Sequence, residues 1–83
     1  MYEILIREYI KKISIEDIND FAIKNNIPIK AGEDKIIYDF IKYRWKDVYN
    51  SNNYDFRELK GKISDELLNS ILILYNKYKS FIK

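Results

Sequence analysis

The sequence contains no cysteine and no histidine, only two glycines and a single proline. Without cysteine the chain forms no disulfide and no thiolate site, and without histidine it lacks the commonest metal ligand and the best proton-transfer group near neutral pH. Ser-His-Asp and Cys-His catalytic arrangements are therefore excluded. Gly32 and Gly61 stand far apart, so the chain has no glycine-rich loop of the kind that binds phosphate.

Long hydrophobic runs are also missing. The longest strongly apolar run, from Ile71 to Tyr75, has five residues, whereas about 20 are needed to cross a bilayer. The first residues carry no basic leader before an apolar stretch and do not resemble a secretory signal. We therefore expect a cytoplasmic protein without a membrane span.

The composition is that of one small globular domain. The 83 residues are 47% hydrophobic and 34% charged, and a core of this size rarely yields more than about 3 to 5 kcal/mol of stability. Ile, Lys, Asn and Tyr make up 44 of the 83 residues, which is typical of a low-GC genome. The number of lysines is therefore poor evidence for nucleic-acid binding.

The spacing of apolar residues predicts helices and no strand. Residues from Tyr2 to about Lys12 repeat at intervals of three and four, as one face of a helix does. Further helices are predicted from the Ser14 cap to Asn25-Asn26, from Lys30 to about Tyr49, briefly after Asp55 as far as Gly61, and from the Ser64 cap onward. The fold class is thus all-α, a single compact bundle of four to five short helices in one domain (1–83).

The inward faces of these helices give a predicted core. It comprises Leu5, Tyr9, Ile13, Ile18, Phe21, Ile37, Phe40, Ile41, Trp45, Val48, Phe56, Leu59, Leu67, Ile71, Leu74, Tyr78 and Phe81.

Several of these segments together resemble a known family. They are 12–18 (KISIEDI), 21–29 (FAIKNNIPI), 40–42 (FIK) and 60–64 (KGKIS) before a Leu/Ile-rich closing helix. In that order they resemble the YqfT-like family of small Firmicute proteins, a family of unknown function, over roughly Lys12 to Ile82. Lys30 departs from the pattern where a capping Ser or Thr is expected, and residues 43–53 are longer than the family's connection. The resemblance implies an all-helical cytoplasmic chain and no catalytic residue.

Acidic residues gather where the predicted helices begin. They are Glu16, Asp17 and Asp20, then Glu33 and Asp34, and finally Asp65 and Glu66. Acids at these positions are stabilised by the helix dipole, by about 0.3 to 1 kcal/mol each. We interpret them as structural, and we predict no catalytic residue, no metal site and no cofactor.

Arg44 is predicted to project from near the middle of the apolar stripe of its helix, between Ile37, Phe40, Ile41 and Val48. A charge in such a place must pair with an acid or reach water. We favour a structural arginine that packs its stem and pairs its head, over a guanidinium that points from a groove at a phosphate or carboxylate.

Basic and aromatic residues alternate in the second half of the chain. Residues 42–83 hold 9 basic and 5 acidic side chains, against 6 and 8 in residues 1–41. Single-stranded nucleic acid is bound by aromatic rings that stack on its bases and by cations that contact its phosphates. The predicted phosphate contacts would be Lys42, Arg44, Lys46, Lys77, Lys79 and Lys83. However, several of the rings lie at core spacing, and a net charge of +2 is a weak electrostatic signal. Nucleic-acid binding is therefore the alternative.

Surplus apolar residues favour a different function. Ile4, Ile23 and Ile73 each fall off the apolar stripe of their own helix, and the last helix is apolar over about half its circumference. A contiguous exposed apolar patch marks an interface. The leading hypothesis is a non-catalytic protein-binding or regulatory module that binds a protein partner or self-associates. Its candidate partner-binding residues are Arg44, Lys42, Lys46, Ile73, Lys77 and Lys79.

Overall fold

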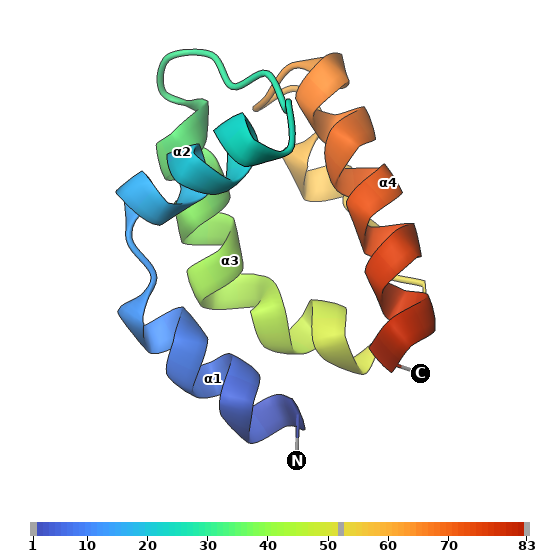
Figure 1. Cartoon of the computed structure of the whole chain (residues 1–83). Helices are drawn as coiled ribbons and strands as arrows, with labels where there is room; N and C mark the ends of the chain where they lie inside the picture. The colour runs from blue at the N-terminus through green and yellow to red at the C-terminus, as the bar shows by residue number, and fades with distance from the viewer. Residues whose placement is uncertain (1, 52, 83) are drawn as a thin grey trace.

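The computed structural model describes residues 2–51 and 53–82, and these fold into helices joined by short connections (Figure 1). The elements are α1 (Tyr2–Lys12), α2 (Ile15–Lys24), α3 (Glu33–Asn50), the 3-10 turn η1 (Arg57–Leu59) and α4 (Asp65–Ile82). Within the described ranges the only β-type pairing is an isolated bridge between Lys60 and Ile63. The predicted all-α bundle is confirmed.

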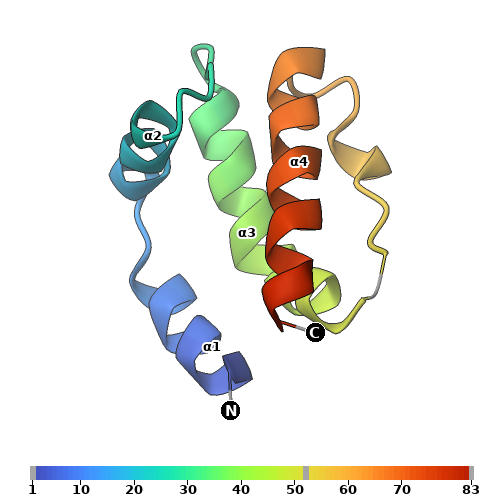
Figure 2. The ribbon, with the colours of Figure 1, turned by 45° about the vertical axis from the view of Figure 1, so that its right-hand side comes forward.

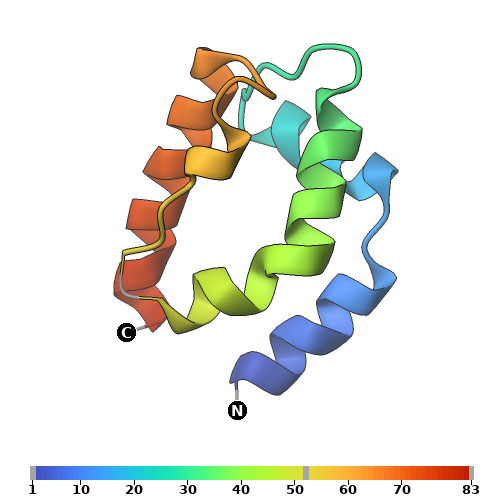
Figure 3. The same cartoon turned by 180° about the vertical axis from the view of Figure 1, so that it is seen from behind.

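Helix α3 lies between the other helices. Helices α1 and α2 cover one side of it, and α4 lies on the other side (Figures 1 and 2). Helices α3 and α4 run in the same direction, and residues 53–64 return along the outside of α4 (Figure 3). Both chain ends lie at the same end of the bundle. Among residues 2–51 and 53–82, no helix is both long and apolar enough to cross a bilayer.

Two serine caps fix the starts of α2 and α4, as the sequence predicts. The Ser14 hydroxyl accepts a hydrogen bond from the Asp17 amide at 3.1 Å, and the Asp17 carboxylate accepts one from the Ser14 amide at 2.9 Å. This reciprocal pair satisfies two amides that the helix leaves free. Ser64 caps α4 through the Leu67 amide at 3.2 Å.

Helix α3 begins three residues later than predicted. The sequence suggests a start at Lys30, but Gly32 adopts a left-handed backbone with φ of +88°, a conformation that costs glycine little. The first helical residue is therefore Glu33. At the other end the helix includes Asn50, which the sequence assigns to a loop.

The core lies where α4 and the returning segment pack against α3 and α2. Its buried residues are Ile18, Ile37, Phe56, Leu59, Ile63 and Leu67. Five of these six belong to the predicted core, and Ile63 does not. Partly buried residues of the predicted core pack around this cluster, namely Ile13, Phe40, Ile41, Val48 and Ile71.

The core prediction is wrong for three residues. Leu5 and Tyr9 are each 63% exposed, and Phe21 is 44% exposed. Tyr9 and Phe21 face the interior of the bundle, as the spacing indicates, but they are left largely uncovered, whereas Leu5 lies on the surface. Two further predicted core residues, Tyr78 and Phe81, lie outside the described side chains.

A buried carboxylate joins the starts of α3 and α4. Glu33 is 7% exposed, and it accepts hydrogen bonds from the Lys30 amide at 2.7 Å and from the Ser64 amide at 2.6 Å. Because α3 and α4 run in the same direction, their positive ends lie together, and a negative charge between them is favourable. Burial alone would raise the pKa of this carboxyl, but the hydrogen bonds from Lys30 and Ser64 outweigh it, so the pKa lies below its ordinary value.

Candidate functional site: an apolar groove

An apolar groove opens between the α1–α2 side of the bundle and α4, with α3 as its floor. Its volume is about 470 Å³. Its walls come from every α-helix and from the connections between them. The lining residues are Ile6, Tyr9, Ile10, Ile13, Asp17, Ile18, Phe21, Ala22, Ile27, Ile29, Ile37, Phe40, Ile41, Trp45, Val48, Tyr49, Ser51, Phe56, Leu67, Ile71, Leu74 and Tyr75.

The edge of the groove on the α1–α2 side is formed by exposed aromatic rings. Tyr9 of α1 and Phe21 of α2 line the groove and are still 63% and 44% exposed. On the floor, Ile37 is buried and Trp45 is half-buried. The groove therefore combines a recessed apolar floor with rings that project at one edge.

Few polar groups face this space. Asp17 is the charged residue in its lining, and its carboxylate already accepts the Ser14 amide in the α2 cap. Ser51 and Tyr75 are engaged with each other, because the Tyr75 hydroxyl donates to the Ser51 carbonyl at 3.3 Å. Across the described residues, no three acidic side chains gather as metal ligands would. The arrangement suits the burial of an apolar surface.

Comparisons with known protein families, curated proteins and solved structures gave no match. The site is therefore interpreted from its own geometry.

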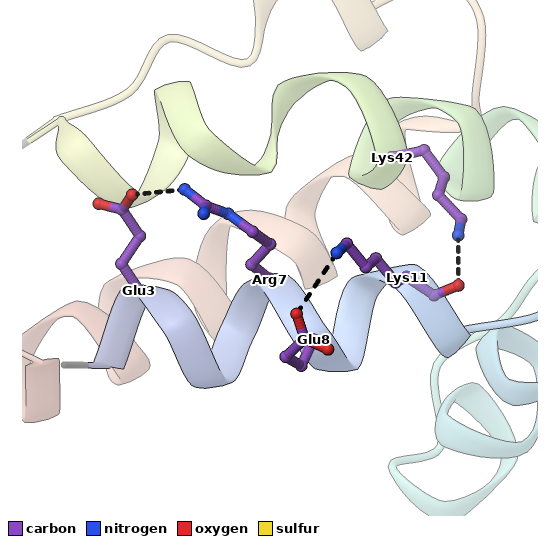
Figure 4. A network of polar contacts seen from close by, with 5 residues as sticks. All are labelled: Glu3, Arg7, Glu8, Lys11 and Lys42. Atoms are coloured by element: carbon purple, nitrogen blue, oxygen red, sulfur yellow. Dashed lines mark hydrogen bonds and ion pairs between the residues drawn. The ribbon is translucent and has the colours of Figure 1, made fainter.

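Lys42, a predicted partner-binding residue, holds α1 against α3 (Figure 4). Its ammonium group donates to the Ile10 carbonyl at 2.7 Å and to the Lys11 carbonyl at 3.3 Å, at the C-terminal end of α1. A cation is favourable there because the last carbonyls of a helix are unpaired and carry its negative end. The same ammonium lies 5.3 Å from the centre of the Tyr38 ring.

Replacing Lys42 by methionine should weaken the attachment of α1 to α3. The Ile10 and Lys11 carbonyls lose the ammonium group, although the Ile10 carbonyl still accepts the Ile13 amide at 3.4 Å. We expect a loss of about 1 kcal/mol of stability together with faster hydrogen exchange of the α1 amides. Urea unfolding and exchange by mass spectrometry measure both. Lys46→Met is the control, because Lys46 is exposed on the same helix. Equal exchange in the two variants would show that the Lys42 contacts do not hold α1.

Arg44 lies on the surface rather than within the apolar stripe. Its Nε donates to Glu58 at 3.1 Å, and the Tyr54 hydroxyl donates to the same carboxylate oxygen at 3.1 Å. Burial, and then Glu58, raise the pKa of Tyr54, so its hydroxyl stays protonated as a donor. The prediction that Arg44 lies within the apolar stripe was wrong, because the side of α3 that carries Arg44 faces Glu58 of η1.

Among the described side chains, the other predicted partner-binding residues do not line the groove. Lys46, Ile73 and Lys77 are exposed, and the Lys79 side chain lies outside the described part of the structure. Ile4 and Ile23 are exposed as well, at 62% and 74%, and they too are absent from the lining. The structure thus does not gather the predicted residues into one site.

The groove residues were missed because sequence reasoning placed them in the core. Tyr9, Phe21, Trp45 and Leu74 carry the same helical spacing as core residues, and spacing indicates an apolar face without indicating what covers it. One signal pointed to the groove. The last helix is apolar over about half its circumference, and Ile71 and Leu74 of that helix line the groove. The off-stripe Ile4, Ile23 and Ile73 do not line it.

Proposed function

We propose that the protein is a non-catalytic protein-binding module that receives an apolar helical segment in the groove. The observation that carries this proposal is the groove itself, which is apolar, has exposed rings at its edge, and has α-helices as its walls. Exposed apolar surfaces of this kind mark binding sites in small proteins. Asp17, Ser51 and Tyr75 of the lining are already hydrogen-bonded, and the lining is mainly apolar, which favours binding over chemistry.

The dimensions of the groove suit a helix. Lining residues of α3 extend from Ile37 to Tyr49, and twelve residues at about 1.5 Å each give a floor of roughly 18 Å. A partner helix of three to four turns would fill this length. Recognition would then follow the helix-in-groove mode, in which apolar side chains at intervals of three and four enter the groove.

Site-specific photo-cross-linking tests this function. A photoreactive phenylalanine analogue at position 21 should cross-link a protein segment, whereas the same analogue at position 23 should not. Phe21 lines the groove and Ile23, on the same helix, does not. The cross-linked segment is identified by mass spectrometry and then made as a peptide.

Binding of that peptide is measured through Trp45, the single tryptophan of the chain, which lines the groove floor. We expect its emission to shift to shorter wavelength as the peptide binds, and the shift to disappear in Phe21→Glu but persist in Ile23→Glu. Equal cross-linking from positions 21 and 23, or an unchanged Trp45 emission, would contradict the proposal.

Nucleic-acid binding by the basic, aromatic half of the chain is the alternative. Its support is the net charge of +4 in residues 42–83. Lys42 and Arg44, which belong to its predicted contacts, are engaged within the fold, because Lys42 donates to carbonyls of α1 and Arg44 to Glu58. Binding of this kind weakens as salt rises, whereas apolar binding in the groove should not.

A further inference from the structure

We infer that the helical segment received by the groove carries a lysine or arginine beside its apolar face, and that this cation binds Asp17. The inference rests on the proposed function, because it names the chemistry of the segment that the groove binds. It makes Asp17 the residue that selects the partner by charge.

Asp17 lies on the α2 wall of the groove. It is the charged residue in a mainly apolar lining, and it stands one turn before Phe21 on the same face of the helix. One oxygen of its carboxylate, Oδ2, accepts the Ser14 amide at 2.9 Å. The other oxygen, Oδ1, accepts no hydrogen bond from the described residues. The carboxylate can therefore accept a donor that enters through the groove.

Asp17 forms no ion pair with the part of the chain that the structure describes. The nearest bases in sequence are Lys12 at the end of α1 and Lys24 at the end of α2, and neither pairs with it. Glu16 and Asp20, on the same helix, are exposed acids. The charge of Asp17 is therefore left for a group from outside the chain.

Covering the groove places a requirement on the partner. A helix that covers the apolar lining removes water from Asp17, and a charge that loses its water without gaining a partner is strongly unfavourable. A lysine or arginine of the partner would donate hydrogen bonds to the carboxylate and neutralise it, and a pair covered in this way is screened little by salt. An acid at the same place would add repulsion. The groove thus distinguishes between amphipathic helices by the charge beside their apolar face.

Two synthetic peptides test the inference with the full chain. Both are amphipathic helices of about 15 residues, or about four turns, with leucines at intervals of three and four. The positions beside the leucines are lysine in one peptide and glutamate in the other. Binding is followed through the emission of Trp45 on the groove floor.

We expect the lysine peptide to bind about 10-fold more tightly, or better, than the glutamate peptide. The net charge of the chain is +2, and by itself it would favour the glutamate peptide. A preference for lysine therefore reports the local charge in the groove.

Asp17→Asn separates the contact from the general charge of the surface. The asparagine oxygen can still accept the Ser14 amide, but the negative charge is lost, so the lysine peptide should bind about 10-fold more weakly. Asp20→Asn is the matched control, because it removes the same charge one turn away in α2 and outside the groove lining. It should change the binding by about 2-fold at most. Circular dichroism checks that both variants fold.

Several results would overturn the inference. They are equal binding of the two peptides to the wild-type chain, tighter binding of the glutamate peptide, and binding of neither. An equal affinity of the lysine peptide for the wild type and Asp17→Asn, or an equal loss in Asp20→Asn, would do the same. The comparison of the two peptides on the wild-type chain needs no variant, so it decides the question even if Asp17→Asn does not fold.

The inference and the proposed function fail in different ways. If both peptides bind equally and shift the Trp45 emission, the groove receives a helix and only the role of Asp17 is wrong. If position 21 cross-links a segment without lysine or arginine, from another protein or from a second copy of the chain, the groove binds protein and the role of Asp17 is again wrong. If neither peptide binds and position 21 cross-links nothing, both proposals are wrong.

Discussion

Replacing Leu59 by alanine is expected to unfold a large share of the molecules at room temperature. Leu59 is 2% exposed at the centre of the core, between Phe56, Ile63 and Leu67. Removing a buried leucine side chain costs about 2 to 5 kcal/mol, and a domain of this size has only about 3 to 5 kcal/mol to lose. Urea unfolding followed by circular dichroism at one protein concentration measures the effect.

The control makes the same substitution at an exposed position. Leu5 is 63% exposed on α1, and Leu5→Ala should change stability by no more than about 0.5 kcal/mol, as surface substitutions do. The comparison also tests the finding that Leu5 does not belong to the core. A loss from Leu5→Ala as large as that from Leu59→Ala would contradict the packing described above.

Glu33→Gln is expected to produce the second largest loss. Glutamine has the same size as glutamate, but one of its two terminal atoms is an NH₂ group instead of an oxygen. This NH₂ group donates hydrogen bonds, so it cannot accept the backbone amide that the carboxylate oxygen accepts. The carboxylate accepts one amide through each oxygen, Lys30 on one and Ser64 on the other. Hydrogen bonds to a charged group contribute about 1.5 to 3 kcal/mol, so we expect a loss of about 2 kcal/mol. Urea unfolding at neutral pH measures this change.

Acid should remove the same contribution from the wild-type protein. The folded-state pKa of Glu33 lies below its ordinary value of 4.5, so the folded state binds fewer protons than the unfolded state in this range. The contribution is fully present above pH 4.5, and it is lost as the pH falls from there through the lower folded-state pKa. The Glu33→Gln variant should therefore lack part of the acid sensitivity of the wild type.

A matched acid separates this contribution from the general effect of low pH. Glu16 stands in the first turn of α2 as Glu33 does in α3, but it is exposed. Glu16→Gln should lose only a few tenths of a kcal/mol at neutral pH. If Glu33→Gln and Glu16→Gln were equally stable at neutral pH, the buried carboxylate would not hold α3 and α4 together.

Local signals in the sequence predicted the helices well. Ser14 and Ser64 cap α2 and α4 as expected because capping depends on residues within one turn of the chain. The predicted bounds of α1 agree with the structure, and η1 follows Asp55, whose carboxylate accepts the Arg57 amide at 2.9 Å. The predicted start of α3 was three residues too early, because the left-handed backbone of Gly32 is not helical and the helix begins only at Glu33.

The groove and the buried carboxylate depend on contacts between distant parts of the chain. Glu33 looked like any other acid at a helix start, and its role appears only when Ser64, 31 residues later, reaches it. Tyr9 and Phe21 looked like core residues because their spacing is that of a core face. The path of residues 53–64 places α4 and so helps to decide what covers that face. Helical periodicity carries no information on this path.

The return of the chain along the outside of α4 also has a kinetic consequence. Helices α2 and α3 follow one another through a short connection, and Asn19 meets Asp34 across only 15 residues. The α3–α4 junction must bring Glu33 and Ser64 together across 31 residues, and Lys42 reaches Ile10 of α1 across 32. Longer loops are slower to close. We therefore expect α2 and α3 to pair first during folding and α1 and α4 to dock afterwards, so that the groove floor stays exposed until both have docked.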